Sequence, residues 1–99
     1  MLHVILLKYV APLDQIEGAT PAHRAWLDQH YRSGLFLTSG PREPRVGGVI
    51  LAAGDLDTLR EVLRSDPFAV GHLAEYEIIA FKPVKRGSQL DLPGVPLVE

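Results

Sequence analysis

The chain opens with the stretch LHVILLKYV, residues 2–10, and this stretch decides the fold. Its β-branched and large apolar residues favour a β-strand, in which successive side chains point to opposite faces of a sheet. One face would carry His3, Ile5, Leu7 and Tyr9, and the other face is also mostly apolar. Both faces of this strand are therefore expected to be covered by other parts of the protein.

A helix is predicted next, after a break at residues 11–14 and a connection that runs to Thr20. The Thr20 hydroxyl would serve as the N-cap, with Pro21 at the first helical position. Apolar residues then recur at helical spacing until Gly34, which would end the helix in a left-handed conformation. This start places His23 in the first helical turn, where the positive end of the helix would disfavour an imidazolium.

The remaining elements follow from apolar runs, turn signals and helix caps. We expect strands over residues 35–39, 49–53 and 75–82, a helix over 56–65 capped by Asp55, and a short helical turn over 67–71. The order βαββαβ is that of an α+β, ferredoxin-like fold. Helices can cover only one face of such a sheet, so a second copy of the chain is expected to cover the other face in a homodimer.

The composition is that of a small globular protein. Its 99 residues correspond to one domain, and 46% of them are hydrophobic. The net charge of −2 gives no electrostatic drive toward nucleic acid or an anionic membrane, and no apolar run approaches the roughly 20 residues that cross a bilayer. The absence of cysteine excludes disulfides and thiolate metal sites and fits a reducing compartment. We expect a soluble, cytoplasmic protein.

Two residues stand out as candidates for acid–base chemistry. His23 titrates near neutrality and can act as a general base, although a histidine on an apolar helix side can also be a core residue. Asp66 precedes Pro67, where it can cap the helical turn, and the same carboxylate can orient a His23 nitrogen. His30 lies two turns after His23, but helical metal ligands are usually three or four residues apart and no third ligand is evident. No metal site is predicted.

The segment Ser39-Gly40-Pro41-Arg42, which ends the second predicted strand, is a candidate for substrate binding. Gly40 allows a ligand to approach the backbone closely, Ser39 can donate a hydrogen bond, and Arg42 can bind a carboxylate. The same residues can equally form an ordinary strand end with a solvated arginine. No nucleotide, phosphate-loop or other cofactor motif occurs, so no cofactor is predicted.

Several short motifs occur in order along residues 1–83. They are the opening hydrophobic strand, Pro21-Ala22-His23, Gly34-Leu35, Ser39-Gly40-Pro41, Gly47-Gly48-Val49 and Asp66-Pro67-Phe68. Together they resemble the YciI-like (YCII-related) family. The resemblance implies a dimeric α+β barrel of ferredoxin-like protomers, related in fold to muconolactone isomerases, with a His–Asp pair in the active site. Matched by motif, that pair is His23 and Asp66.

The function implied by the resemblance is that of a small-molecule enzyme. It would transfer a proton without a cofactor, as a lyase or isomerase, using His23 and Asp66 in a pocket between the first helix and the sheet. The alternative is a non-catalytic small-ligand-binding or accessory protein of the same fold, and a structural interaction module is a third interpretation. A direct His23–Asp66 hydrogen bond of ~2.6–3.2 Å beside a pocket would favour catalysis.

Residues 84–99, at the end of the chain, contain none of the motifs that resemble this family. We therefore expect a domain over residues 1–83, followed by a tail over 84–99 that is a candidate for packing at the dimer interface.

Overall fold

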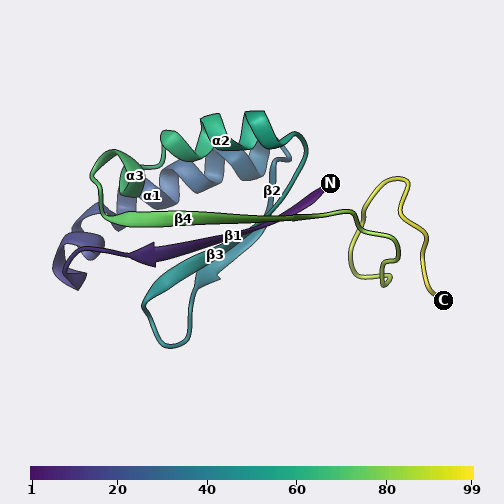
Figure 1. Ribbon diagram of the computed structural model, residues 1–99, viewed down its shortest axis with the longest axis horizontal. Helices are drawn as coiled ribbons and strands as arrows, with labels where there is room; N and C mark the ends of the chain where they lie inside the picture. The colour runs from purple at the N-terminus through teal and green to yellow at the C-terminus, as the bar shows by residue number, and fades with distance from the viewer.

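The computed structural model describes residues 1–99 and shows one four-stranded antiparallel sheet with helices on one of its faces (Figure 1). The strands are β1 (Leu2–Tyr9), β2 (Phe36–Pro41), β3 (Gly47–Ala53) and β4 (Ala74–Phe81). The helices are α1 (Leu13–Arg32), α2 (Leu56–Arg64) and α3 (Pro67–Val70). The strand order is β2-β3-β1-β4, which confirms the α+β, ferredoxin-like prediction.

The opening strand is central, as its sequence predicts. β1 pairs with β3 on one side and with β4 on the other. Its helix-facing side chains include Ile5 and Leu7, which are fully buried. They form the hydrophobic core together with Ile50 of β3 and with helical residues such as Ile16 and Leu59. Each such side chain contributes about 1.5–3 kcal/mol when it is removed from water.

Helix α1 begins at Leu13, about two turns before the predicted start, so the assignment of Thr20 and Pro21 to the helix N-terminus is wrong. Pro21 lies inside the helix, and the Thr20 hydroxyl donates to the Ile16 carbonyl at 2.7 Å instead of capping. An interior proline costs about 3 kcal/mol relative to alanine. Burial of Ile16, which is worth about 1.5–3 kcal/mol, offsets most of that cost, and the helix continues through the proline.

The position of His23 changes with this correction. His23 lies in the middle of α1 and not in its first turn, so the expected influence of the positive helix end on its imidazole is wrong. The other end of α1 is as predicted, because Gly34 follows the helix with a φ of 85°.

In the second half of the chain, the structure agrees closely with the elements predicted from the sequence. Asp55 caps α2, accepting a hydrogen bond from the Thr58 amide at 2.9 Å, and Asp66 caps α3. The other strand and helix ends lie within two residues of the predicted ones. Strand β3 starts earlier, at Gly47, where a Cβ atom would stand 1.7 Å from the Leu7 carbonyl oxygen, so glycine is required for β1 and β3 to pair this closely.

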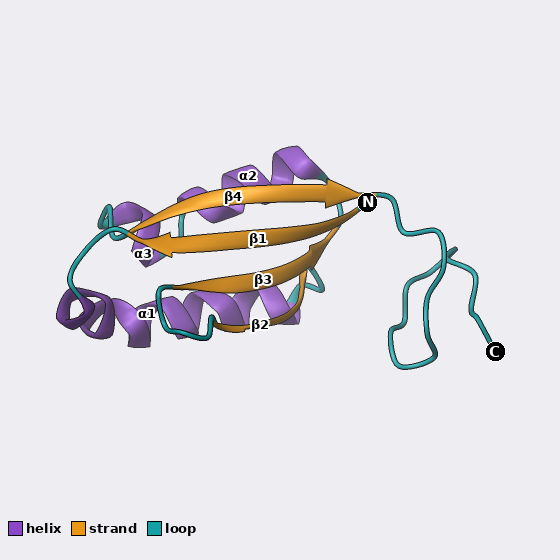
Figure 2. Cartoon of the chain, turned by 60° about the horizontal axis from the view of Figure 1, so that its bottom comes forward, coloured by secondary structure: helices purple, strands orange, loops and turns teal.

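The second face of the sheet carries no helix (Figure 2). The register of β1 with its neighbours places Val4 beside Leu51 and Ile79 on this open face. Ile79 is 46% exposed and Phe81 is 43% exposed, which is unusual for large apolar side chains in a sheet. A second copy of the chain over this face stays a prediction.

Residues after β4 leave the sheet and project beyond its end (Figures 1 and 2). Arg86 holds this segment together, because its amide donates to the Pro96 carbonyl at 2.9 Å and its guanidinium donates to the carbonyls of Leu90 and Val95. The segment is thus a closed loop and not an extended strand. Its packing on a second copy stays a prediction.

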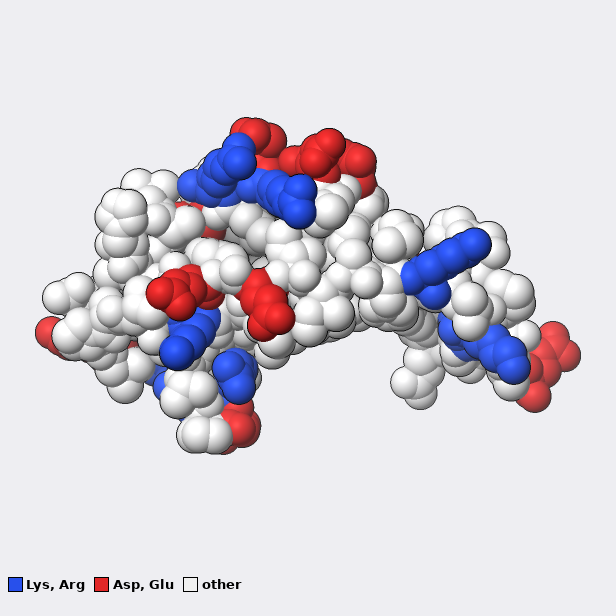
Figure 3. Space-filling view, in the orientation of Figure 1, with Lys and Arg blue, Asp and Glu red and all other residues white.

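On the face of the molecule seen in Figure 3, charges of both signs lie side by side. On α2, for example, Arg60 lies 3.9 Å from Asp57, and Arg64 pairs with Glu61. Exposed pairs of this kind contribute about 0–1 kcal/mol each. None of the helices has the length and apolar character needed to cross a bilayer.

Candidate active site

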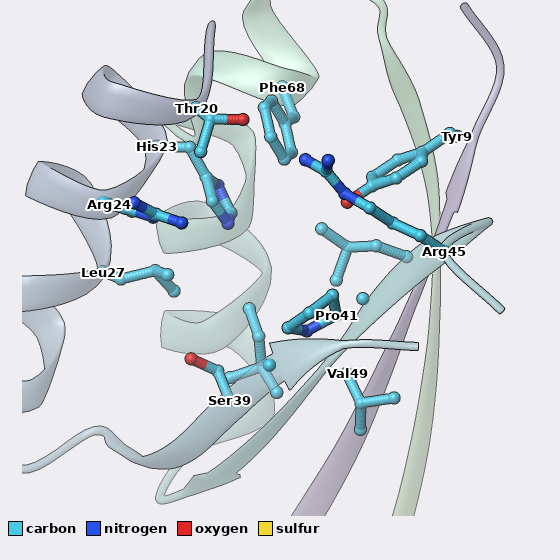
Figure 4. A pocket seen from close by; sticks show the side chains of 14 residues that line it. Tyr9, Thr20, His23, Arg24, Leu27, Ser39, Pro41, Arg45, Val49 and Phe68 are labelled. Atoms are coloured by element: carbon cyan, nitrogen blue, oxygen red, sulfur yellow. The ribbon is translucent and has the colours of Figure 1, made fainter. Parts of the chain in front are cut away.

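A cavity of about 490 Å³ lies between α1 and the helix-facing side of the sheet (Figure 4). Its size is within the range of small-molecule sites, roughly 300–1,000 Å³. Its walls come from α1, α3, three strands and the loop between β2 and β3. The apolar part of the lining includes Tyr9, Leu27, Ile50 and Phe68.

His23 of α1 is part of this wall. Its Nδ1 lies 2.7 Å from Asp66 Oδ1, and its side chain is 13% exposed. The imidazole stacks on the Phe68 ring, with centroids 4.0 Å apart and planes at 7°. An ionised Asp66 carboxylate can only accept a hydrogen bond, so Nδ1 of His23 is the donor in this contact and Nε2 is the nitrogen left for a ligand. Figure 4 shows the ring directed into the cavity.

Asp66 is fully buried behind His23. Besides His23, its carboxylate accepts the Phe68 amide at 3.0 Å and the Tyr76 hydroxyl at 2.5 Å. A carboxylate has enough lone pairs to serve all three donors. Capping of α3 and the contact with His23 therefore occur together, so the two interpretations left open by the sequence do not exclude one another.

Tyr76 reaches Asp66 from β4. Burial is the main cause that raises the pKa of Tyr76 above its ordinary value, and the hydrogen bond to Asp66 and the charge of that carboxylate act in the same direction. The phenol therefore remains a hydrogen-bond donor at neutral pH. Tyr76 was not among the residues predicted from the sequence. Its spacing of two from Ile78 nevertheless predicts that Tyr76 and Ile78 both face the helices.

The predicted substrate-binding segment is only partly at the cavity. Ser39 and Gly40 line it, and the Ser39 hydroxyl is held by a hydrogen bond with the Tyr31 hydroxyl. Arg42 is not among the lining residues, and its amide donates to the Gly47 carbonyl at 2.9 Å. A substrate-binding role for these residues stays a prediction.

Two other arginines line the cavity, and the sequence did not single them out. Arg24 follows His23 on α1, on the side that helical spacing assigns to solvent, and Arg45 lies in the loop between β2 and β3. A long side chain reaches around a helix, and a loop has no periodicity, so neither position gave a signal.

His30 does not line the cavity and belongs to an aromatic cluster that Trp26 connects to His23. Its ring centroid lies 5.2 Å from that of Trp26 and 5.3 Å from that of Phe36, and burial lowers the pKa of His30. Trp26 is 6% exposed and donates from Nε1 to the Ser65 hydroxyl at 2.9 Å, as a core residue does. No group of three His, Cys, Asp or Glu side chains is placed to hold a metal ion.

Comparison with solved structures shows a shared fold. The chain is similar to 5-chloro-2-hydroxyhydroquinone dehydrochlorinase from Burkholderia phenoliruptrix AC1100, solved in complex with 2,5-dihydroxybenzoquinone. The TM-score is 0.71 at 20% sequence identity, and the match covers 92% of this chain and 100% of the dehydrochlorinase chain. Among curated proteins, no sequence matches this chain significantly.

The family relationship comes from the sequence itself. The YCII-related domain matches residues 1–82, which is most of the chain and includes both His23 and Asp66. The motifs that resemble this family in the sequence lie within the same range. The chain therefore belongs to the family of proteins that contain the YCII-related domain.

Proposed function

We propose that this protein is a small-molecule enzyme that transfers a proton with His23 as general base, in a reaction of the lyase or isomerase type. One observation carries the proposal: His23 Nδ1 lies 2.7 Å from the buried Asp66 carboxylate, while its ring lines a cavity of about 490 Å³. A base that is oriented by a carboxylate and faces a substrate-sized cavity is the arrangement that general-base catalysis needs.

The chemistry follows from the tautomer. His23 Nε2 takes a proton from a carbon next to a carbonyl group, the electron pair of the broken C–H bond forms a C=C bond to the carbonyl carbon, and the C=O π pair moves onto the oxygen as an enolate. In a lyase reaction, the enolate re-forms the carbonyl group, the C=C bond moves to the adjacent carbon, and the leaving group departs from that carbon with its bonding pair. In an isomerase reaction, the proton returns to a different atom. Asp66 stabilises the imidazolium formed in between, and such general-base action is worth about 10²–10⁴ in rate.

The structural neighbour supports the lyase form of the reaction. It is named as a dehydrochlorinase, and loss of hydrogen chloride is an elimination that begins with removal of a proton. The cyclic dihydroxyquinone in its structure is also of a size that suits the cavity described here. Substituted cyclic carbonyl compounds are therefore the first substrates to test.

The decisive experiment measures turnover of chlorinated hydroxyhydroquinones and related β-substituted cyclic ketones by absorbance and chloride release. We expect His23→Ala to lower kcat/KM by about 10²–10⁴-fold and to keep a cooperative thermal transition. His72→Asn is the matched control, because His72 is exposed, lies outside the cavity and has a φ of 55° that asparagine tolerates. Equal turnover by wild type and His23→Ala would remove His23 from the mechanism.

The non-catalytic alternative makes a different set of predictions. A ligand-binding or accessory protein would bind these compounds without consuming them, and Asp66→Asn would leave their affinity nearly unchanged. Binding titrations beside the turnover assay therefore separate the two functions.

We also propose that the working form is a homodimer joined through the open face of the sheet. The apolar side chains on that face, with Ile79 and Phe81 nearly half exposed, support this assembly. Light scattering after size exclusion is expected to give twice the mass of the 10.9 kDa chain. Charged substitution of one of them, Ile79→Lys, should produce a monomer, and a wild-type monomer at micromolar concentration would contradict the proposal.

A further inference from the structure

We propose that the cavity selects a small organic anion with an apolar body, and that Arg45 and Arg24 are the residues that recognise its charge. The inference rests on the proposed function in that it concerns the cavity that holds His23. The inference adds the charge of the ligand and names the residues that bind this charge.

The charged side chains that line the cavity itself, Arg24 and Arg45, are both cationic. The lining includes two arginines and one histidine but no aspartate or glutamate. Elsewhere the surface mixes the two signs, as the arginines of α2 do with their acidic neighbours. A concave site lined by one sign of charge concentrates ions of the opposite sign. Asp66 is not part of this lining, because it is buried and its carboxylate faces His23, the Phe68 amide and the Tyr76 hydroxyl.

The two arginines line the same cavity from different elements of the fold. Figure 4 shows Arg24 entering from α1 and Arg45 entering from the loop between β2 and β3, with His23 between them in this view. A guanidinium matches the two oxygens of a carboxylate or of an ionised hydroxyquinone, since it offers parallel N–H donors. The shared chemistry is a delocalised oxyanion, and the apolar lining provided by Leu27 and Phe68 would contact the rest of the ligand.

Glu17 shows how Arg45 would be held before the ligand arrives. Its carboxylate lies 3.4 Å from Arg45 Nη1, and the side chains of Arg45 and Glu17 are 41% and 58% exposed. A solvent-exposed pair at this distance is weak. Arg45 can therefore exchange the Glu17 carboxylate for an anion in the cavity, and Glu17 acts as a competitor that lowers ligand affinity.

The test compares matched probes by isothermal titration calorimetry with the full chain. Benzoate against benzamide tests a carboxylate, and 2,5-dihydroxybenzoquinone, which is ionised at neutral pH, against 2,5-dimethoxybenzoquinone tests an ionised enol. We expect at least one anion to bind about tenfold or more tightly than its neutral partner, which corresponds to 1.4 kcal/mol. This preference should fall as ionic strength rises.

Variants assign the effect to residues. Arg45→Gln and Arg24→Gln should each weaken binding of the preferred anion about three- to tenfold and leave the neutral probe unchanged. Glu17→Gln should strengthen anion binding about two- to threefold. Arg32→Gln removes a charge from the exposed end of α1, outside the cavity, and should change nothing. Thermal unfolding of each variant verifies that it is folded.

Three outcomes overturn the proposal: no binding of either anion at millimolar concentration, equal binding of charged and neutral probes, or an anion preference that survives Arg24→Gln combined with Arg45→Gln. None of these measurements requires turnover. Failure of the anion preference therefore leaves the base role of His23 intact, and turnover that does not depend on His23 leaves the anion preference intact.

Discussion

The two halves of the chain, β1-α1-β2 and β3-α2-α3-β4, supply different parts of the site and hold them in different ways. The first half brings His23 on a helix that has no side-chain cap and contains a proline, so tertiary packing of Ile16 and Trp26 sets its position. The second half brings Asp66, whose position is set by its own cap of α3. The position of His23 thus depends on distant contacts, whereas the position of Asp66 depends on its immediate neighbours in the chain.

The largest expected effect comes from removing the carboxylate of the second half. Asp66→Ala leaves the His23 Nδ1–H, the Phe68 amide and the Tyr76 hydroxyl without an acceptor, and it should lower the free energy of unfolding by about 3–5 kcal/mol. Asp66→Asn keeps a capping oxygen, so it should cost clearly less stability and lower activity instead. Urea unfolding measures the stability of both variants. Equal stability of Asp66→Ala and Asp66→Asn would show that the three hydrogen bonds contribute less to the free energy of unfolding than their burial implies.

The next effect has the opposite sign and concerns the first half. Pro21→Ala restores an amide inside α1 and should raise the free energy of unfolding by about 1–3 kcal/mol. Pro67→Ala is the matched control, because Pro67 occupies the first turn of α3, where proline is favourable, and its loss should be neutral or destabilising. If Pro21→Ala instead lowers the free energy of unfolding in chemical denaturation, the proline helps to hold His23 in its position.

A smaller effect is expected where β4 supports the carboxylate. Tyr76→Phe removes one hydrogen bond to Asp66 with little change in volume, so the free energy of unfolding should fall by about 1–2 kcal/mol. Turnover should fall less than in Asp66→Asn, since the His23 contact remains. If Tyr76→Phe abolishes turnover at unchanged stability, the phenol has a direct role that this geometry does not give it.

The smallest effect is a pH dependence that arises in the first half. Burial lowers the pKa of His30 below 6.5, so the folded protein favours the neutral ring. The stabilisation is present above the unfolded pKa and is lost as pH falls from about 6.5 toward the folded pKa. Unfolding midpoints between pH 7 and pH 5 should therefore decline less in His30→Gln than in wild type, and parallel declines would contradict this.

The sequence predicts the second half better than the first, and the reason is physical. Asp55 and Asp66 act within three residues along the chain, so their signals are complete in the local sequence. The start of α1 is decided by burial of Ile16 against a distant sheet, and Pro21 gives a local signal that this burial overrides. Pro12 directly precedes the helix and Asp14 lies in its first turn, where an acidic side chain is favourable, but the prediction from sequence assigned both residues to the break after the first strand.

Only part of the candidate site could be predicted from the sequence. The motifs point to His23 and Asp66, which are 43 residues apart in sequence and come into contact only in the fold. Arg24 and Arg45 were missed because nothing in their spacing points to the cavity, and Arg42 was chosen in their neighbourhood for its strand-end position. Which cation reaches a pocket depends on the path of a loop, and that path is not encoded in periodicity.

The face-to-face stack of His23 on Phe68 also makes the histidine observable. Its ring lies parallel to the phenyl ring with centroids 4.0 Å apart, so the imidazole protons stand in the shielding field of the aromatic ring current. The Hε1 resonance of His23 should therefore appear upfield of those of the other histidines in a proton NMR spectrum. That single shifted signal would report protonation and ligand entry at His23 directly, without a label and without a known substrate.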